Sequence, residues 1–143
     1  MGALAGDTGN VGEGPNAEAV RVLIDALNRD DMDSAVQRVD SQAELRPLRA
    51  KLEGGTYRGQ DGLREMNADL RADWDELRFE IEELRESGDA VVVRGSLTAH
   101  GRVSGVDLAV PMGLLIRVRD GNLVYWETFS DPDAAFREAG IEP

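Results

Sequence analysis

The sequence predicts an α+β fold in which helices cover one face of a curved antiparallel sheet. Three observations predict it: an amphipathic helical pattern near the N-terminus, long strand-like runs in the second half, and a short closing helix with clear end signals. With 143 residues, of which 41% are hydrophobic, the chain suffices for one domain with a substantial core. We therefore expect a single domain over residues 16–143 and a flexible, glycine-rich tail over residues 1–15.

Apolar spacing and end signals predict the helices. Apolar residues recur at every third or fourth position in the first helix, and the third helix carries one such stripe. The second helix starts in an Asp-rich cluster, where carboxylates accept orphan backbone N–H bonds. Asp131 as N-cap, Pro132 at the first helical position and Gly140 as stop define the closing helix. The predicted helices span about residues 16–27, 32–39, 62–73 and 132–139.

Strand signals dominate the region between the third and the closing helix. Leu77, Phe79 and Ile81 alternate as in a strand, although the same stretch also fits a helix. We predict a strand with a bulge near Glu83, because the hairpins that follow need a partner. Pro111 cannot donate to a sheet ladder, so we expect a bulge or a sheet edge there. A further short strand is expected over residues 43–48, followed by a loop.

Composition excludes several classes of function. The chain has no cysteine and one histidine, so neither disulfides nor a zinc site are expected. The Asp-rich cluster at residues 28–34 lacks the central Gly and terminal Glu of a calcium loop, and no metal is predicted there. A net charge of −12 argues against nucleic acid as a partner. Neither a signal peptide nor a membrane-spanning apolar run is apparent, so we expect a cytoplasmic protein with no membrane partner.

Two stretches carry a resemblance to a known family. ELRPLRAKLEGGTYRGQDGLREM and RVRDGNLVYWETFSDPDAAFREAG resemble SnoaL-like polyketide cyclases, which belong to the nuclear-transport-factor-2-like superfamily. The resemblance covers roughly residues 16–141. It implies a cone in which a curved antiparallel sheet wraps three N-terminal helices around an internal cavity. It also implies a homodimer that pairs through the sheet face, and chemistry without a cofactor.

The last predicted strand is also similar to that of limonene-epoxide hydrolases. This similarity implies that Trp126 and Thr128 face the cavity. Thr128 stands where those enzymes have a catalytic carboxylate. The stretch RGSLT at residues 94–98 likewise lacks the aspartate of their Arg-x-Asp pair. Epoxide hydrolysis by that mechanism is therefore not expected.

Alternation along the last strand places Trp126, Thr128 and Ser130 on one face and Tyr125 and Phe129 on the other. Trp126 either fills the core or lines a ligand pocket. The neighbouring hydroxyl groups favour a pocket, because apolar binding sites carry a few placed polar groups. Tyr125 and Phe129 would then suit a sheet-to-sheet dimer contact.

Four further residues are candidates for a site. His100 is the one side chain whose ordinary pKa suits proton transfer near neutral pH, and it is a general base if it points inward. Its position at a turn beside Gly101 favours a solvated rim residue instead. Arg46 would clamp an enolate or carboxylate, or else pair with a surface glutamate. Tyr57 and Trp74 flank the third helix and either line the cavity mouth or pack against that helix.

Two functions follow from these features. The first is a cofactor-independent enzyme of cyclase, isomerase or hydrolase type, acting by acid–base chemistry on a small hydrophobic oxygenated compound. The second is a binding module for such a compound that performs no reaction. A dimeric structural domain with a filled cavity is the remaining alternative.

Overall fold

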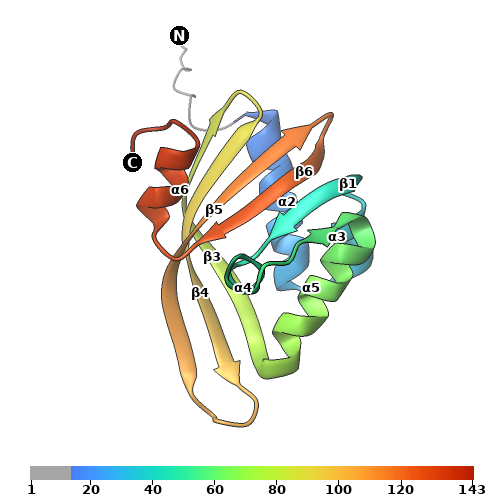
Figure 1. Cartoon of the computed structure of the whole chain (residues 1–143), viewed down its shortest axis with the longest axis vertical. Coiled ribbons are helices and arrows are strands. Elements are labelled where there is room, and N and C mark those ends of the chain that lie inside the picture. The colour runs from blue at the N-terminus through green and yellow to red at the C-terminus, as the bar shows by residue number, and fades with distance from the viewer. Residues whose placement is uncertain (1–13) are drawn as a thin grey trace.

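The computed structural model describes residues 14–143 (Figure 1). The first and third predicted helices are present as α2 and α5, and the predicted hairpins are present as β3 to β6. The described elements are α2 (Pro15–Asn28), α3 (Met32–Val36), β1 (Val39–Arg46), α4 (Leu48–Glu53), β2 (Tyr57–Arg58), α5 (Gly59–Asp73), β3 (Trp74–Ser87), β4 (Ala90–Gly101), β5 (Asp107–Arg119), β6 (Asn122–Phe129) and α6 (Pro132–Glu138).

Within the described residues the strands form one curved sheet in the order β2-β1-β6-β5-β4-β3. Neighbouring strands are antiparallel except β1 and β6, which run parallel. Figure 1 shows β4 and the distal half of β5 extending beyond the rest of the sheet as a long arm. The predicted α+β fold with a curved, largely antiparallel sheet is confirmed. None of the described helices is long and apolar enough to cross a membrane.

The two faces of the sheet carry different helices. On the inner face, Val91, Val93 and Ile116 belong to the main core together with side chains of α2 and α5. On the outer face, Val92 and Leu115 pack with α6. The prediction that all helices lie on one face of the sheet is therefore wrong. The short closing helix instead seals part of the opposite side.

The helix ends follow the predicted chemistry. Asp31 is the N-cap of α3, and its side chain accepts a hydrogen bond from the backbone N–H of Ser34 at 3.2 Å. Asp131 caps α6 in the same way, with Pro132 in the first turn. The predicted tail was expected to reach residue 15, but Pro15 is already the first residue of α2. Residues 1–13 of that tail lie outside the described part of the chain.

The ambiguous stretch before the hairpins is a strand, β3, as predicted. Its pairing with β4 shifts between Ile81 and Glu83, which confirms the predicted bulge, and shifts a second time between Asp75 and Arg78. Pro111 lies in β5 beyond Gly113, the last residue that pairs with β6. There β5 pairs only with β4, so Pro111 occupies a sheet edge and not a bulge.

Two short elements were not predicted. The expected strand over residues 43–48 begins earlier, at Val39, and ends at Arg46, where Pro47 opens α4. The expected loop contains β2, which pairs with β1 through Leu45 and Tyr57. Together α4 and β2 return the chain to the sheet edge and place Tyr57 at the start of α5.

Candidate functional site

A cavity of about 410 Å³ lies between the inner face of the sheet and the helices α2 and α5. Its volume falls in the range of roughly 300–1,000 Å³ that is usual for small-molecule sites. Most of its wall is apolar. The helices contribute Ile24, Leu27, Met66 and Leu70, and the strands contribute Trp74, Leu77, Phe79, Leu97, Met112, Leu114 and Trp126. Pro47 and Leu48 close the wall on the side of α4.

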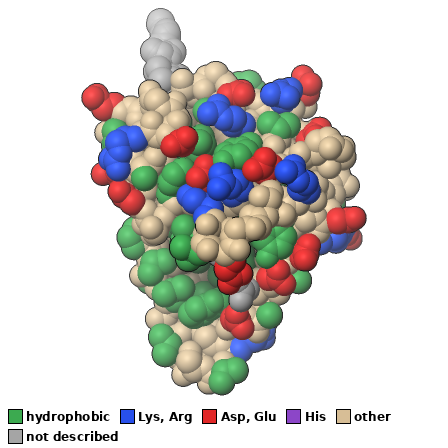
Figure 2. Space-filling view, in the orientation of Figure 1, with side chains coloured by type: hydrophobic (Ala, Val, Ile, Leu, Met, Phe, Trp, Pro, Cys, Tyr) green, Lys and Arg blue, Asp and Glu red, His purple; other side chains and the backbone are tan. Residues whose placement is uncertain are grey.

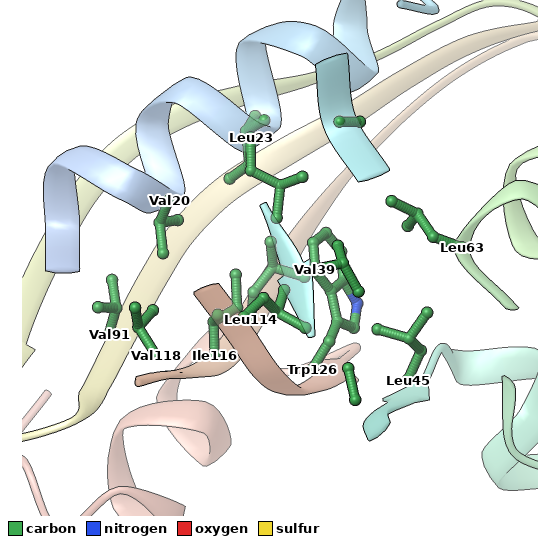
Figure 3. Close-up of a cluster of buried hydrophobic side chains, with 14 of the residues drawn as sticks. Val20, Leu23, Val39, Leu45, Leu63, Val91, Leu114, Ile116, Val118 and Trp126 are labelled. Carbon is green, nitrogen blue, oxygen red and sulfur yellow. The ribbon is translucent and has the colours of Figure 1, made fainter. Parts of the chain in front are cut away.

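Trp126 belongs to both the core and the cavity wall. Only 8% of its surface is exposed, and Figure 3 shows its indole among Val39, Leu45 and Leu63. The indole Nε1 donates a hydrogen bond to Thr128 Oγ1 at 2.9 Å. The two alternatives for Trp126 therefore do not exclude each other, because one side of the ring packs while the residue still lines the cavity.

Thr128 is the one polar side chain that is buried among the side chains that the structure describes, with 6% of its surface exposed. It follows Trp126 by two positions on β6, so both side chains project to the inner face. Its hydroxyl oxygen accepts the indole N–H, and its hydroxyl hydrogen has no acceptor among the described residues. The cavity wall thus contains a buried donor that no described residue satisfies.

Tyr57 and Asp69 form a second polar pair on the cavity wall. The phenol O–H donates to Asp69 Oδ2 at 2.6 Å. Tyr57 is held by its pairing with Leu45 and by the close approach of α5, since a Cβ on Gly62 would lie 2.9 Å from the Tyr57 carbonyl carbon. Both side chains are half-buried, which keeps the carboxylate beside an apolar wall.

Asp69 is a site residue that was not predicted from the sequence. A signal was nevertheless present, because Asp69 lies three positions after Met66 and directly before Leu70. It therefore flanks the apolar stripe of α5, where a helix side chain reaches the cavity.

Two other polar residues of the wall, Asn28 and Arg71, form hydrogen bonds between the elements that surround the cavity. Asn28 on α2 donates to the Phe79 carbonyl at 3.0 Å and accepts from the Phe79 N–H at 2.8 Å. Arg71 near the end of α5 donates to the Leu27 carbonyl at 2.9 Å. These bonds tie both helices to one another and to β3. They fix the width of the cavity.

The structure brings Trp126, Thr128, Tyr57 and Trp74 together around the cavity. Trp74 is the first residue of β3 and is half-buried at the end of α5. These four predicted site residues thus share one space. Arg46 and His100 do not line it, and their placement differs from the expected one.

His100 lies near the end of β4, on the long arm. Its side chain is 40% exposed, and Nδ1 lies 2.8 Å from Asp107 Oδ1 across the hairpin. This hydrogen bond, opposed by burial and helped by the charges of Asp107, Glu76 and Asp75, raises the pKa of His100 above 6.5. Because Leu97 lines the cavity, alternation turns His100 to the other face. It is therefore a solvated residue and not an inward-facing base.

Arg46 lies on the outer face. Ala43 and Leu45 are buried, so alternation along β1 directs Arg46 away from the cavity. Its Nη1 donates to the Tyr125 hydroxyl at 3.4 Å, and this bond raises the pKa of the guanidinium. The predicted clamp on a substrate enolate or carboxylate inside the cavity is thus not formed.

Glu127 is the centre of this outer-face network. Lys51 Nζ lies 2.8 Å from Glu127 Oε2, and the Tyr125 hydroxyl donates to Oε1 at 2.7 Å. Burial by itself raises the pKa of Glu127, but the bonds from Lys51 and Tyr125 outweigh it and leave that pKa below its usual value. Burial and the Glu127 bond raise the pKa of Tyr125. The network joins α4 to β6.

The outer face and the arm also differ in surface character. Figure 2 shows apolar side chains gathered over the lower arm, whereas acidic and basic side chains are mixed over the upper part. Val103 and Val106 at the arm's tip are exposed. Among residues 14–143, no group of three or more His, Cys, Asp or Glu side chains is arranged to hold a metal ion.

Comparisons with known proteins agree with this geometry. The SnoaL-like domain family matches residues 20–126. An NTF2-like protein of unknown function from Burkholderia pseudomallei superposes with a TM-score of 0.74 at 22% identity, covering 87% of this chain and 97% of that one. A SnoaL-like polyketide cyclase homologue from Shewanella denitrificans gives 0.71 at 16% identity, covering 82% and 90%.

A third similar structure is TerC co-crystallised with polyporic acid, with a TM-score of 0.74 and 24% identity over 87% of this chain and 97% of that one. No curated protein matched the chain. The family match spans most of the chain, and the structural matches share its cone-shaped fold. The chain belongs to the SnoaL-like domain family.

Proposed function

We propose that this protein binds a small hydrophobic oxygenated molecule inside the cavity of the cone, without a cofactor. The observation that carries the proposal is the cavity itself: about 410 Å³ of space with a mostly apolar wall. Such a space favours an apolar ligand, because burial contributes about 25 cal/mol for each Å² of apolar surface removed from water. Polar groups placed within it orient the ligand.

Each lining residue has a distinct role in this proposal. Trp126 and Trp74 supply broad apolar surfaces, while Thr128 and Tyr57 supply polar contacts. TerC, a structure with the same fold, was co-crystallised with polyporic acid, which supports an organic ligand for this chain. Arg46 and His100 are given no role in binding.

A thermal-shift screen tests the proposal. Terpenoids, polyketide fragments, steroids and fatty acids form the panel, and a ligand at about one hundred times its Kd adds roughly 2.7 kcal/mol to the free energy of unfolding. For a domain of this size the melting temperature then rises by several degrees. Absence of any shift across the panel would contradict the proposal.

A matched pair of variants locates the binding. Leu97→Trp places a large ring in the cavity and is expected to abolish the ligand's shift. Leu52→Trp makes the same change on α4, where the side chain is 87% exposed, and is expected to leave the shift intact. If Leu97→Trp folds and still binds with unchanged affinity, the ligand lies elsewhere.

An enzymatic function is the second candidate, and the pair of Tyr57 and Asp69 favours it. A carboxylate beside an apolar wall is suited to proton abstraction next to a carbonyl group. The base is then Asp69, not His100. Once a ligand is identified, Asp69→Asn is expected to abolish its turnover while binding persists. Turnover within a few-fold of wild type would remove this candidate.

We also propose that the protein is a homodimer that pairs through the outer sheet face. Beside α6 this face retains an open groove, and Arg117, Tyr125 and Glu127 are among the residues that line it. Phe129 is partly covered by the α6 cluster, so Tyr125 is the better candidate for a central contact. Sedimentation as a monomer at micromolar concentration would contradict pairing. Cytoplasmic residence stays a prediction of the sequence.

A further inference from the structure

The Thr128 hydroxyl is oriented by its neighbour. A hydroxyl group has one hydrogen to donate and lone pairs to accept with. Trp126 Nε1 donates to the Thr128 oxygen at 2.9 Å, so the hydroxyl hydrogen must point away from the indole. No described residue accepts that hydrogen, although the side chain is only 6% exposed. A buried donor without an acceptor costs free energy, and an acceptor atom on a ligand would remove that cost.

Asp69 offers the complementary group. Its Oδ2 accepts from the Tyr57 hydroxyl at 2.6 Å, and Oδ1 accepts no hydrogen bond from the groups that the structure describes. Asp69 lies on α5 and Thr128 on β6, so the acceptor and the donor line the cavity from the helix side and from the sheet side. The Tyr57 bond restrains the carboxylate.

We propose that the cavity selects a ligand with two oxygen functions on a compact apolar frame: a carbonyl oxygen that accepts from Thr128 and a hydroxyl group that donates to Asp69. Hydroxyketones are the chemical class with this pattern. The inference rests on the proposed function, because it assigns the polar ends of the same cavity. It adds which residue forms a hydrogen bond with which functional group of the ligand.

A series of probes with one carbon skeleton separates the contribution of the carbonyl group to the affinity from that of the hydroxyl group. Tetralin carries no oxygen, 1-tetralone carries the carbonyl group, 5,6,7,8-tetrahydro-2-naphthol carries the hydroxyl group, and the hydroxy-1-tetralones carry both. Several positions of the hydroxyl group are used, so that the span between the two oxygens varies. Isothermal titration calorimetry gives the affinity of each probe. We expect the best hydroxytetralone to bind most tightly, with each oxygen contributing roughly 3- to 10-fold.

Variants assign the contributions to residues. Thr128→Val keeps the shape and removes the hydroxyl, so the advantage of 1-tetralone over tetralin should disappear. The same variant should leave the advantage of the tetrahydronaphthol unchanged. Thr128→Ser restores the donor and should restore the ketone preference. Asp69→Leu should abolish the advantage of the tetrahydronaphthol over tetralin and leave the advantage of 1-tetralone unchanged. If a variant lowers the affinity of every probe in the series by the same factor, the loss reflects packing, and the assignment is overturned.

The wild-type series also separates this inference from the proposed function. If all probes bind with equal affinity, the cavity binds apolar molecules but gains no affinity from their oxygen atoms. The inference is then wrong, while the proposed function stands. If none of the probes binds, both are overturned.

Discussion

Glu86 on β3 accepts a hydrogen bond at 2.8 Å from the backbone N–H of Ala17, 69 residues earlier on α2. The same carboxylate oxygen accepts from the N–H of Gly14 at 2.8 Å. A side chain from the sheet thus performs the capping that a local Ser or Asp usually provides, and Gly14 has no side chain with which to do so.

Removal of this cap should destabilise the whole fold. Glu86→Ala leaves two backbone donors without their acceptor, so we expect the free energy of unfolding to fall by about 1–2 kcal/mol. Urea unfolding measures it. Glu82→Ala on the same strand removes an exposed hydrogen bond from Ser96 and should change stability by less than about 0.5 kcal/mol. Equal losses in both variants would refute the role of the cap.

Gly95 marks a point where the sheet has no room for a side chain. A Cβ there would lie 2.2 Å from the Glu80 carbonyl oxygen and 2.7 Å from the Phe79 ring. Gly95→Ala should therefore cost about 1–3 kcal/mol or more and shift Phe79 on the cavity wall. Differential scanning calorimetry should show a melting temperature lower by several degrees. Gly55→Ala, which meets open space, should not lower it.

The Lys51–Glu127 contact should make the free energy of unfolding depend on pH in the acidic range. Glu127 has a folded-state pKa below its usual value of 4.5, so its contribution is present above that pH and is lost as pH falls through the lower, folded-state value. Lys51→Met removes the ammonium group and should raise the pKa of Glu127. The stability advantage of wild type over Lys51→Met, measured by urea unfolding, should be largest near neutral pH and shrink as the pH falls below 4.5. A difference that does not change with pH would point to lost packing alone.

His100 allows a direct titration, since it is the only histidine of the chain. Its NMR signal should report a pKa above 6.5, because Asp107 bonds to the ring. The pair therefore stabilises the fold fully below the unfolded-state pKa, and this stabilisation is lost as pH rises through the folded-state pKa. Asp107→Asn should lower the measured value, whereas Asp120→Asn at another turn should not. A wild-type pKa at or below 6.5 would contradict the pairing.

Strong local patterns were enough to predict most of the fold. Alternation of Leu77, Phe79 and Ile81 identified a strand, and the residues Asp131 and Pro132 identified the start of α6. The helix α4 escaped prediction because six residues are too few for a periodic pattern to show: Leu48 and Leu52 are one turn apart, but Leu48 lines the cavity while Leu52 is 87% exposed. Its helical form depends on tertiary contacts such as the bond from Lys51 to the Thr128 carbonyl at 3.0 Å. Such contacts are not visible in local sequence.

The candidate site was predictable to the extent that side-chain direction follows from alternation. Trp126 and Thr128 line the cavity as expected, because both lie on one face of β6. The face of His100 could not have been found by counting along β4, because Val91, Val92 and Val93 are all buried and lie on both faces of the sheet. The partnership of Tyr57 and Asp69 could not have been counted in this way, because it depends on how α5 crosses the sheet.

The parallel pairing of β1 with β6 has a consequence for biosynthesis. β6 lies between β1 and β5 in the sheet, so it joins β1, which is synthesised early, to the hairpin strands, which are synthesised later. Trp126 and Thr128 are carried by that joining strand. A growing chain therefore cannot complete the cavity until β6 has been synthesised as far as Phe129 and has paired with both β1 and β5. Long-range closure of this kind is slow compared with local helix formation. Binding of a ligand would thus distinguish completed molecules from nascent ones.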